Sequence, residues 1–228
     1  MAYFGIFDGH GGHACATLLQ HGLHTALACR ADLHADGRAA AAAAFRKVDD
    51  DCCTSLRSSD DASGSTALVA VYDGRARQLV VAHAGDSRCV LCAGGGAAVA
   101  LTSDHRLTRT DERARIEAAG GLIVNNRLNG TLAISRSFGD VAHKGGAGAP
   151  TVTATPEVTI RAIAADDEFV VLGSDGLWDA LSNQSVVNFV RTELGAHHDL
   201  HKAAVSTTAE ALRRGSVDNV SCIIVLFT

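Results

Sequence analysis

The spacing of apolar residues predicts two helices in the first quarter of the chain. Leucines recur at helical intervals, and this pattern predicts a helix over residues 14–29 whose apolar face carries Leu18, Leu19, Leu23 and Leu27. The alanine run at 39–44 has high helix propensity and leads into apolar residues up to Leu56, which predicts a second helix.

From residue 63 onward the pattern changes to short apolar runs separated by turn residues. Residues 65–72 and 78–84 flank Asp73-Gly74 and predict a β-hairpin. Further apolar runs predict strands at 88–93, 97–101, 158–163, 168–172 and 220–227. Helical spacing returns at 182–195, with Ser182 as N-cap, and at 200–214. This order of elements predicts one α+β domain, a β core covered by an early and a late pair of helices.

Composition narrows the class of protein without identifying it. The 228 residues are 47% hydrophobic and 20% charged, with a net charge of -5 and no broad basic region, which argues against nucleic-acid binding. No apolar run reaches the roughly 18 residues that a membrane span needs, and the first residues lack the features of a signal peptide. Seven cysteines without regular spacing are typical of reduced thiols, so we expect an intracellular protein of the cytoplasm and/or nucleus.

Cys89 and Cys92 form a CxxC pattern, but they lie in a predicted strand. Residues three apart on a strand point to opposite faces of the sheet. We therefore predict that this pair does not bind zinc.

Four aspartates lie at the ends of predicted strands. Asp8 follows an apolar run and begins an Asp-Gly-His-Gly-Gly segment, and Asp86, Asp175 and Asp218 have similar positions beside other strands. Each of them, taken alone, is compatible with an ordinary surface turn. If the strand ends share one rim of the core, the carboxylates converge there, and their mutual repulsion requires a cation. Oxygen-only ligands favour Mg²⁺ or Mn²⁺ over zinc.

Such a site would suit phosphate chemistry. Two divalent ions bridged by one aspartate can activate a water molecule for in-line attack on a phosphoryl group. The Gly9 carbonyl adds an oxygen donor beside Asp8, and His10 lies where it could protonate a leaving alkoxide, since histidine titrates at about pH 6.5. No P-loop, dinucleotide fingerprint or nucleophilic-serine elbow offers competing chemistry. The residues indicate a metal-dependent hydrolase, with ordinary strand-end turns as the alternative.

Seven short motifs carry a resemblance to a known family. They are DGHGG at 8–12, SGSTA at 63–67, GDSR at 85–88, LAISR at 132–136, FGD at 138–140, DGLWD at 175–179 and DNVS at 218–221. Their order is that of the type 2C, metal-dependent protein serine/threonine phosphatases, which the chain resembles over essentially its whole length. Any one motif is weak evidence, whereas seven in order are highly specific.

The resemblance implies a fold and an activity. The fold would be α+β, a four-layer α/β/β/α sandwich of two antiparallel sheets flanked by helix pairs. The activity would be hydrolysis of phosphoserine and phosphothreonine in phosphoprotein substrates. We expect residues 1–228 to form a single catalytic domain, to act as a monomer, and to carry a flap-like insertion at about 104–133 beside the active site.

The resemblance also implies site residues. The ligands of two Mg²⁺ or Mn²⁺ ions would be Asp8 as the bridge, the Gly9 carbonyl, Asp175 and Asp218. Asp86 and Asp179 resemble the ligands of a weaker third ion. His10 matches the general acid, whereas residues 63–66 and Asp140 resemble structural motifs rather than direct catalysts.

One departure from the family pattern concerns the start of the chain. Family members carry, before the DGHGG segment, a strand with a phosphate-binding arginine and an acidic pair, and no such segment precedes Asp8. We interpret the chain as truncated at its N-terminus and lacking the first strands. Metal binding is expected to survive, while phosphate affinity and turnover fall without that guanidinium. The alternative function is a catalytically impaired, phosphatase-like module that binds phosphoproteins.

Overall fold

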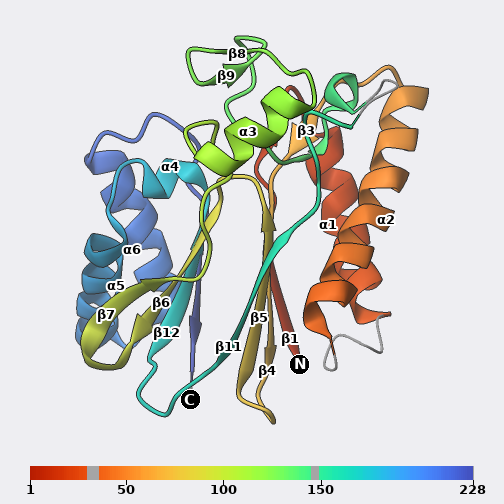
Figure 1. Ribbon diagram of the computed structural model, residues 1–228. Helices are drawn as coiled ribbons and strands as arrows, with labels where there is room; N and C mark the ends of the chain where they lie inside the picture. The colour runs from red at the N-terminus through yellow and green to blue at the C-terminus, as the bar shows by residue number, and fades with distance from the viewer. Residues whose placement is uncertain (30–35, 145–148, 228) are drawn as a thin grey trace.

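The computed structural model describes residues 1–29, 36–144 and 149–227, and its longer strands form two antiparallel four-stranded sheets (Figure 1). The first sheet has the order β1-β4-β5-β11, with β1 (Ala2–Ile6), β4 (Ala67–Asp73), β5 (Gln78–Ala84) and β11 (Glu157–Ala162). The second has the order β13-β12-β6-β7, with β13 (Cys222–Leu226), β12 (Phe169–Gly173), β6 (Arg88–Ala93) and β7 (Ala97–Ala100). Short strands form two further sheets from β2 (Gly9–His10), β3 (Gly64–Ser65) and β10 (Phe138–Gly139), and from β8 (Ile123–Val124) and β9 (Arg127–Leu128).

Helices lie on the outer face of each four-stranded sheet. In Figure 1, α1 (Ala14–Ala28) and α2 (Gly37–Ser58) cover the first sheet, and α5 (Asn183–His197) and α6 (Leu200–Arg213) cover the second. Two shorter helices, α3 (Thr110–Ala118) and α4 (Asp175–Trp178), lie across the end of the sheets at the top of the same view. None of the helices in the described ranges is long and apolar enough to cross a membrane.

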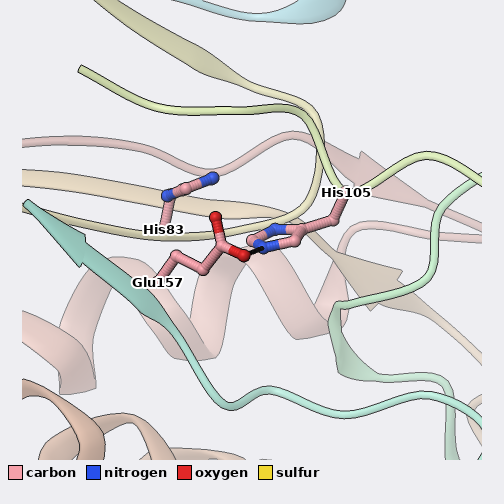
Figure 2. A group of neighbouring side chains, drawn as sticks. All are labelled: His83, His105 and Glu157. Atoms are coloured by element: carbon pink, nitrogen blue, oxygen red, sulfur yellow. Dashed lines mark ion pairs between the residues drawn. The ribbon is translucent and has the colours of Figure 1, made fainter. Parts of the chain in front are cut away.

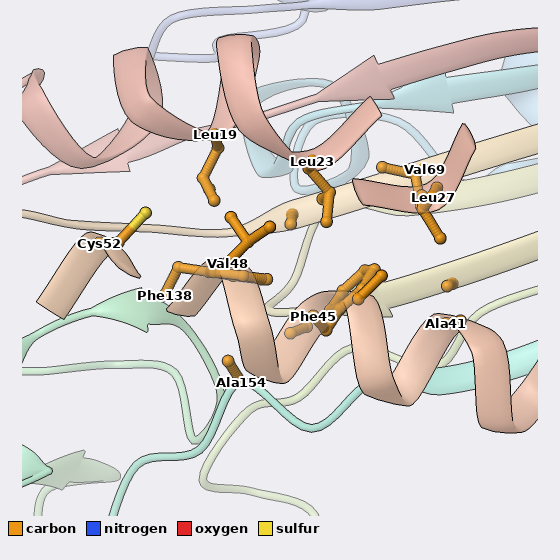
Figure 3. Packing of buried hydrophobic residues seen from close by; sticks show 14 of the residues in the cluster. Leu19, Leu23, Leu27, Ala41, Phe45, Val48, Cys52, Val69, Phe138 and Ala154 are labelled. Carbon is orange, nitrogen blue, oxygen red and sulfur yellow. The ribbon is translucent and has the colours of Figure 1, made fainter. Parts of the chain in front are cut away.

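Three clusters of buried hydrophobic residues lie between these layers and pack them together. The first packs α1 and α2 on the first sheet, as Figure 3 shows for Leu23, Phe45 and Val69. The second lies between the two sheets and includes Leu68, the neighbour of Val69 in β4, because successive side chains of a strand point to opposite faces. The third packs α5 and α6 on the second sheet and includes Val187. The alternation along β4 therefore supplies two different cores from one strand.

The structure confirms the α+β class and most of the predicted elements. The β-hairpin pairs Asp73 with Gln78, and the helix over residues 14–29 is α1. Ser182 caps α5 by accepting a hydrogen bond from the backbone N–H of Ser185. The terminal strand was predicted from residue 220 but begins at Cys222, because residues 219–221 form a loop bonded to Ser174.

The predicted placement of the CxxC cysteines on opposite faces of a strand is also confirmed. Cys89 belongs to the cluster between the sheets, whereas Cys92 belongs to the cluster under α5 and α6. The two thiols lie on opposite faces of β6 and cannot ligate one ion.

Candidate metal centre

The strands place the predicted aspartates at one end of the two sheets. Asp8 follows β1, Asp86 lies in the link from β5 to β6, and Asp175 follows β12. Asp218 precedes β13, whose pairing with β12 brings it beside the Asp175 turn. Gly176 packs so closely on the 218–219 loop that a Cβ atom there would collide with the Asn219 carbonyl. The absence of a side chain at Gly176 thus lets the two acidic segments touch.

The carboxylates are close enough to change one another's acidity. Burial, together with the negative charges of Asp175 and Asp218, raises the pKa of Asp8 to about 6. Burial also raises the pKa of Asp175, with Asp218 and Asp179 adding to the effect. Burial and then the charge of Asp175 raise the pKa of Asp86 to about 7. The structure therefore brings these five predicted residues into one electrostatic cluster, which a divalent cation would stabilise.

One oxygen of this cluster fits a metal ligand. Asp175 Oδ1 is buried and has no hydrogen-bond partner in the part of the chain that the structure describes. A buried acceptor without a partner carries a desolvation penalty of about 1–3 kcal/mol or more. A hard cation bound among Asp8, Asp175 and Asp218 would remove that penalty, so the donor set fits Mg²⁺ or Mn²⁺.

Thr66 fixes the backbone that carries Asp8. The Asp8 amide donates to Thr66 Oγ1 at 3.1 Å, and the Thr66 amide donates to the Asp8 carbonyl at 2.9 Å. The same hydroxyl lies 2.9 Å from Ser87 Oγ, next to Asp86. Gly85 has a φ of 116°, and a Cβ there would lie 2.6 Å from Thr66 Cβ. The SGSTA motif thus joins the two turns that present Asp8 and Asp86.

His10 contacts Asp140 directly. Its Nε2 lies 2.8 Å and 3.0 Å from the two carboxylate oxygens, so Nε2 carries a proton and donates it. Burial lowers the pKa of His10, but Asp140 and, to a smaller extent, Asp8 outweigh burial, and the pKa is raised overall. Ser137 Oγ also donates to Asp140. Gly64 packs against this pair, and a Cβ atom there would overlap both His10 Nε2 and Asp140 Oδ2.

Arg106 lies between two of the aspartates. Its Nη2 donates to Asp179 Oδ1 at 2.7 Å, and its Nε lies 3.3 Å from Asp86 Oδ2. Asp104 is also near, with Oδ2 at 3.8 Å from Arg106 Nε, but Arg88 binds both Asp104 oxygens at 2.9 Å and 2.7 Å. A guanidinium therefore already neutralises part of the acidic cluster.

The sequence pattern of one family, described as protein phosphatase 2C, matches residues 1–220. The chain belongs to the protein phosphatase 2C family. Among similar proteins, probable protein phosphatase 2C 59 of Oryza sativa subsp. japonica is 39% identical over 227 residues, which cover 98% of this chain and 66% of the rice protein. Probable protein phosphatase 2C 27 of the same organism is 36% identical over 233 residues, which cover 100% of this chain and 65% of that relative. The chain thus spans about two thirds of the length of these relatives.

Solved structures show the same fold. The structure described as that of a C. elegans sex determining protein superposes with a TM-score of 0.89 at 24% identity, over 98% of this chain and 56% of the other. The crystal structure of serine-threonine phosphatase 2C from Toxoplasma gondii superposes with a TM-score of 0.77 at 22% identity, over 99% of this chain and 84% of the other. At these identities the likeness concerns the protein phosphatase 2C fold alone.

A second cluster in this phosphatase 2C chain was not singled out by the sequence analysis. His83, His105 and Glu157 place one ligand atom each within 4.8 Å of the others (Figure 2). However, His105 Nδ1 accepts a hydrogen bond from the Gly85 amide at 3.2 Å, so its proton is at Nε2, the atom that faces Glu157 at 3.5 Å. Arg109 binds both oxygens of Glu157 at 2.7 Å and 3.2 Å. The spacing would fit a metal ion, but the hydrogen bonds favour a buried neutral imidazole that holds the turn before Asp86.

Sequence reasoning did not predict two contacts in the candidate site of this protein phosphatase 2C chain. Asp140 was expected to belong to a structural motif rather than to act as a direct catalyst, and the expectation did not include its contact with His10, from which it is 130 residues distant. Arg106 was not singled out, and nothing in the local sequence separates it from the other arginines of residues 104–133. Both contacts depend on long-range packing; the only sequence signal for Asp140 was its place in the FGD motif, and Arg106 had only its place in the predicted flap.

Proposed function

We propose that this protein hydrolyses phosphoserine and phosphothreonine in proteins in a reaction that depends on Mg²⁺ or Mn²⁺. The observation that carries the proposal is the convergence of Asp8, Asp175 and Asp218 with the His10–Asp140 pair at one end of the sheets. Membership of the protein phosphatase 2C family supports the same chemistry. The fit of Asp175 Oδ1 to a cation supports the metal dependence.

The residues that would hold the metal follow from this cluster. Asp8, the Gly9 carbonyl, Asp175 and Asp218 would bind two ions, with Asp8 as the bridge. Asp86 and Asp179 are the candidate ligands of a third ion. When bound, the ions supply charge neutralisation for the phosphoryl group and acidify a water molecule.

His10 would act as the general acid that donates a proton to the leaving group. Because Nε2 donates to Asp140, the proton available for transfer is the one on Nδ1 of the imidazolium. The Asp140 carboxylate raises the pKa of His10, so in a larger fraction of the molecules the ring carries both protons at neutral pH. The side chain is 34% exposed, which leaves it accessible to a substrate. Asp140 thus orients the ring and favours its acidic form.

The remaining features of the proposal describe the protein as a whole. Residues 1–228 would act as a single phosphatase domain in a four-layer sandwich, as a monomer, in the cytoplasm and/or nucleus. The segment at about 104–133, which carries α3, β8 and β9 across the end of the sheets in Figure 1, would be the flap beside the substrate.

The test is a phosphatase assay on a phosphothreonine peptide with Mn²⁺, comparing the protein with Asp175→Asn. We expect Mn²⁺-dependent release of phosphate. The rate should fall by roughly tenfold to a hundredfold in the variant, the range seen when metal sites lose a supporting group. If the unchanged protein is no more active than Asp175→Asn, the proposal that it is a hydrolase is wrong. Binding of the phosphopeptide without turnover would then support the alternative, an impaired phosphoprotein-binding module.

A further inference from the structure

Arg106 has a geometry that matches a cation site. Its guanidinium lies between Asp86, whose side chain is 9% exposed, and Asp179, whose side chain is 56% exposed. The contact with Asp179 is a hydrogen bond at 2.7 Å, whereas the approach of Nε to Asp86 at 3.3 Å is an ion pair without a hydrogen bond. The guanidinium is held more firmly on the solvent side of the site than on the buried side.

A guanidinium and a divalent ion compete for the same carboxylate oxygens. Both are cations that prefer charged oxygen partners, and the site cannot hold both at bonding distance because their charges repel. Asp179 Oδ1, which Arg106 binds, is one of the oxygens that a third ion would need. Asp104 does not provide a substitute, because Arg88 binds both of its oxygens.

We propose that Arg106 is a built-in cation that occupies the third metal position, so that this chain binds two Mn²⁺ or Mg²⁺ ions and admits a third only when the guanidinium moves away. The inference rests on the proposed function, because it assumes that Asp8, Asp175 and Asp218 hold the first two ions. It differs from the expectation that Asp86 and Asp179 are free to ligate a metal.

The arginine also connects this position to the predicted flap. Arg106 lies at the start of the 104–133 segment, and its backbone forms an isolated β-bridge with Ile134, which directly follows that segment. The neighbouring His105 carbonyl accepts two hydrogen bonds from Ser135. Displacement of the Arg106 side chain by an ion would therefore act at the base of the flap, where its two ends meet.

The test counts bound Mn²⁺ in metal-stripped protein at pH 7.5, from the electron paramagnetic resonance signal of the free ion, with isothermal titration calorimetry for affinity. We expect two ions in the unchanged chain and three in Arg106→Met. The third should bind about tenfold or more tightly in the variant, because a hydrogen bond between charged groups contributes at least that factor. Arg106→Gln serves the same purpose if the methionine variant does not fold.

Three controls define the site. Arg106→Met combined with Asp179→Asn should return to two ions, because the freed site then lacks a ligand. Asp179→Asn alone should also bind two, since Asp179 holds Arg106 rather than metal in the unchanged chain. Arg113→Met removes a surface arginine of α3, which pairs with Glu117 at 2.9 Å, and should bind two.

The outcomes separate this inference from the proposed function. Three ions in the unchanged chain, or two in both Arg106 variants, would overturn the inference and leave the two-ion site intact. Loss of an ion in Asp179→Asn alone would overturn it as well. No bound Mn²⁺ in the unchanged chain would instead contradict the proposed function, and the inference with it.

Discussion

The buried imidazole of His105 leads to a prediction about stability and pH. Burial lowers the pKa of His105 to about 3, and the positive charges of His83 and Arg136 contribute in the same direction. The unfolded chain therefore takes up a proton at this position more readily than the folded protein. Stability is lost as the pH falls below about 6.5, the ordinary value for histidine, and continues to fall toward the folded-state pKa. The substitution that tests this is His105→Asn, whose Oδ1 can accept the Gly85 amide hydrogen bond in place of Nδ1.

The size of the effect follows from the pKa and the burial. A pH of 5.0 is about 1.5 units below the pKa of histidine in the unfolded chain. At about 1.36 kcal/mol per unit, protonation of the unfolded chain favours unfolding by about 2 kcal/mol relative to pH 7.5. No discount for solvent applies, because the His105 side chain is 0% exposed. For a domain of this size, the same change lowers Tm by roughly 4–8 °C. Asp8 and Asp86 have raised pKa values and act in the opposite direction, so only a comparison of two proteins isolates His105.

The assay is urea unfolding of both proteins at pH 7.5 and 5.0, with a chelator present. His105→Asn should be less stable at both pH values because asparagine is smaller than the ring that it replaces. The decrease on acidification should nevertheless be about 2 kcal/mol smaller in the variant than in the unchanged chain. Equal decreases, within about 0.5 kcal/mol, would refute the argument that His105 is held neutral by burial.

Further predictions concern the pair at His10, the base of the flap and the metal. Asp140→Asn removes the charge that raises the pKa of His10, so the loss of kcat at high pH should begin at a lower pH; an unchanged pH profile would argue against the pair. Arg88→Met removes the two hydrogen bonds to Asp104 and the one to Asn183, and should cost about 1.5–3 kcal/mol in urea unfolding, whereas the exposed Lys47→Met should cost much less; similar costs would contradict this. Added Mn²⁺ should raise the Tm of chelator-treated protein more at pH 7.5 than at 5.0, because protons compete for the carboxylates; a larger shift at the lower pH would oppose this.

The elements that could be predicted from the sequence are those with a strong local signal. The leucine spacing of α1, the alanine run of α2 and the Asp73-Gly74 turn each determine structure within a few residues. The first hairpin strand was predicted at 65–72 and lies at Ala67–Asp73, and β13 begins two residues after its predicted start, because pairing with a partner strand decides where a strand begins and ends. Local pattern thus predicts the type of an element better than its limits.

The candidate site was predictable only in part, for a physical reason. The strand-end positions of Asp8, Asp175 and Asp218 are visible in the sequence, but their convergence depends on strand order, which spacing does not specify. Arg106 reaches Asp179 across 73 residues, and the sequence alone does not show which carboxylate a long arginine side chain will bind. The motif order suggested the convergence in this case, and the structure adds the charges that surround it.

The distribution of cysteines over the layers has a practical consequence. Cys15 and Cys52 lie beneath the first helix pair, Cys89 between the sheets and Cys92 beneath the second helix pair, whereas Cys29 is exposed. A thiol reagent can reach each buried group only when the layer above it opens. Labelling rates, resolved by mass spectrometry, would therefore report the local opening of each layer without any added probe. The chain contains its own set of reporters, one or two for every interface that holds the sandwich together.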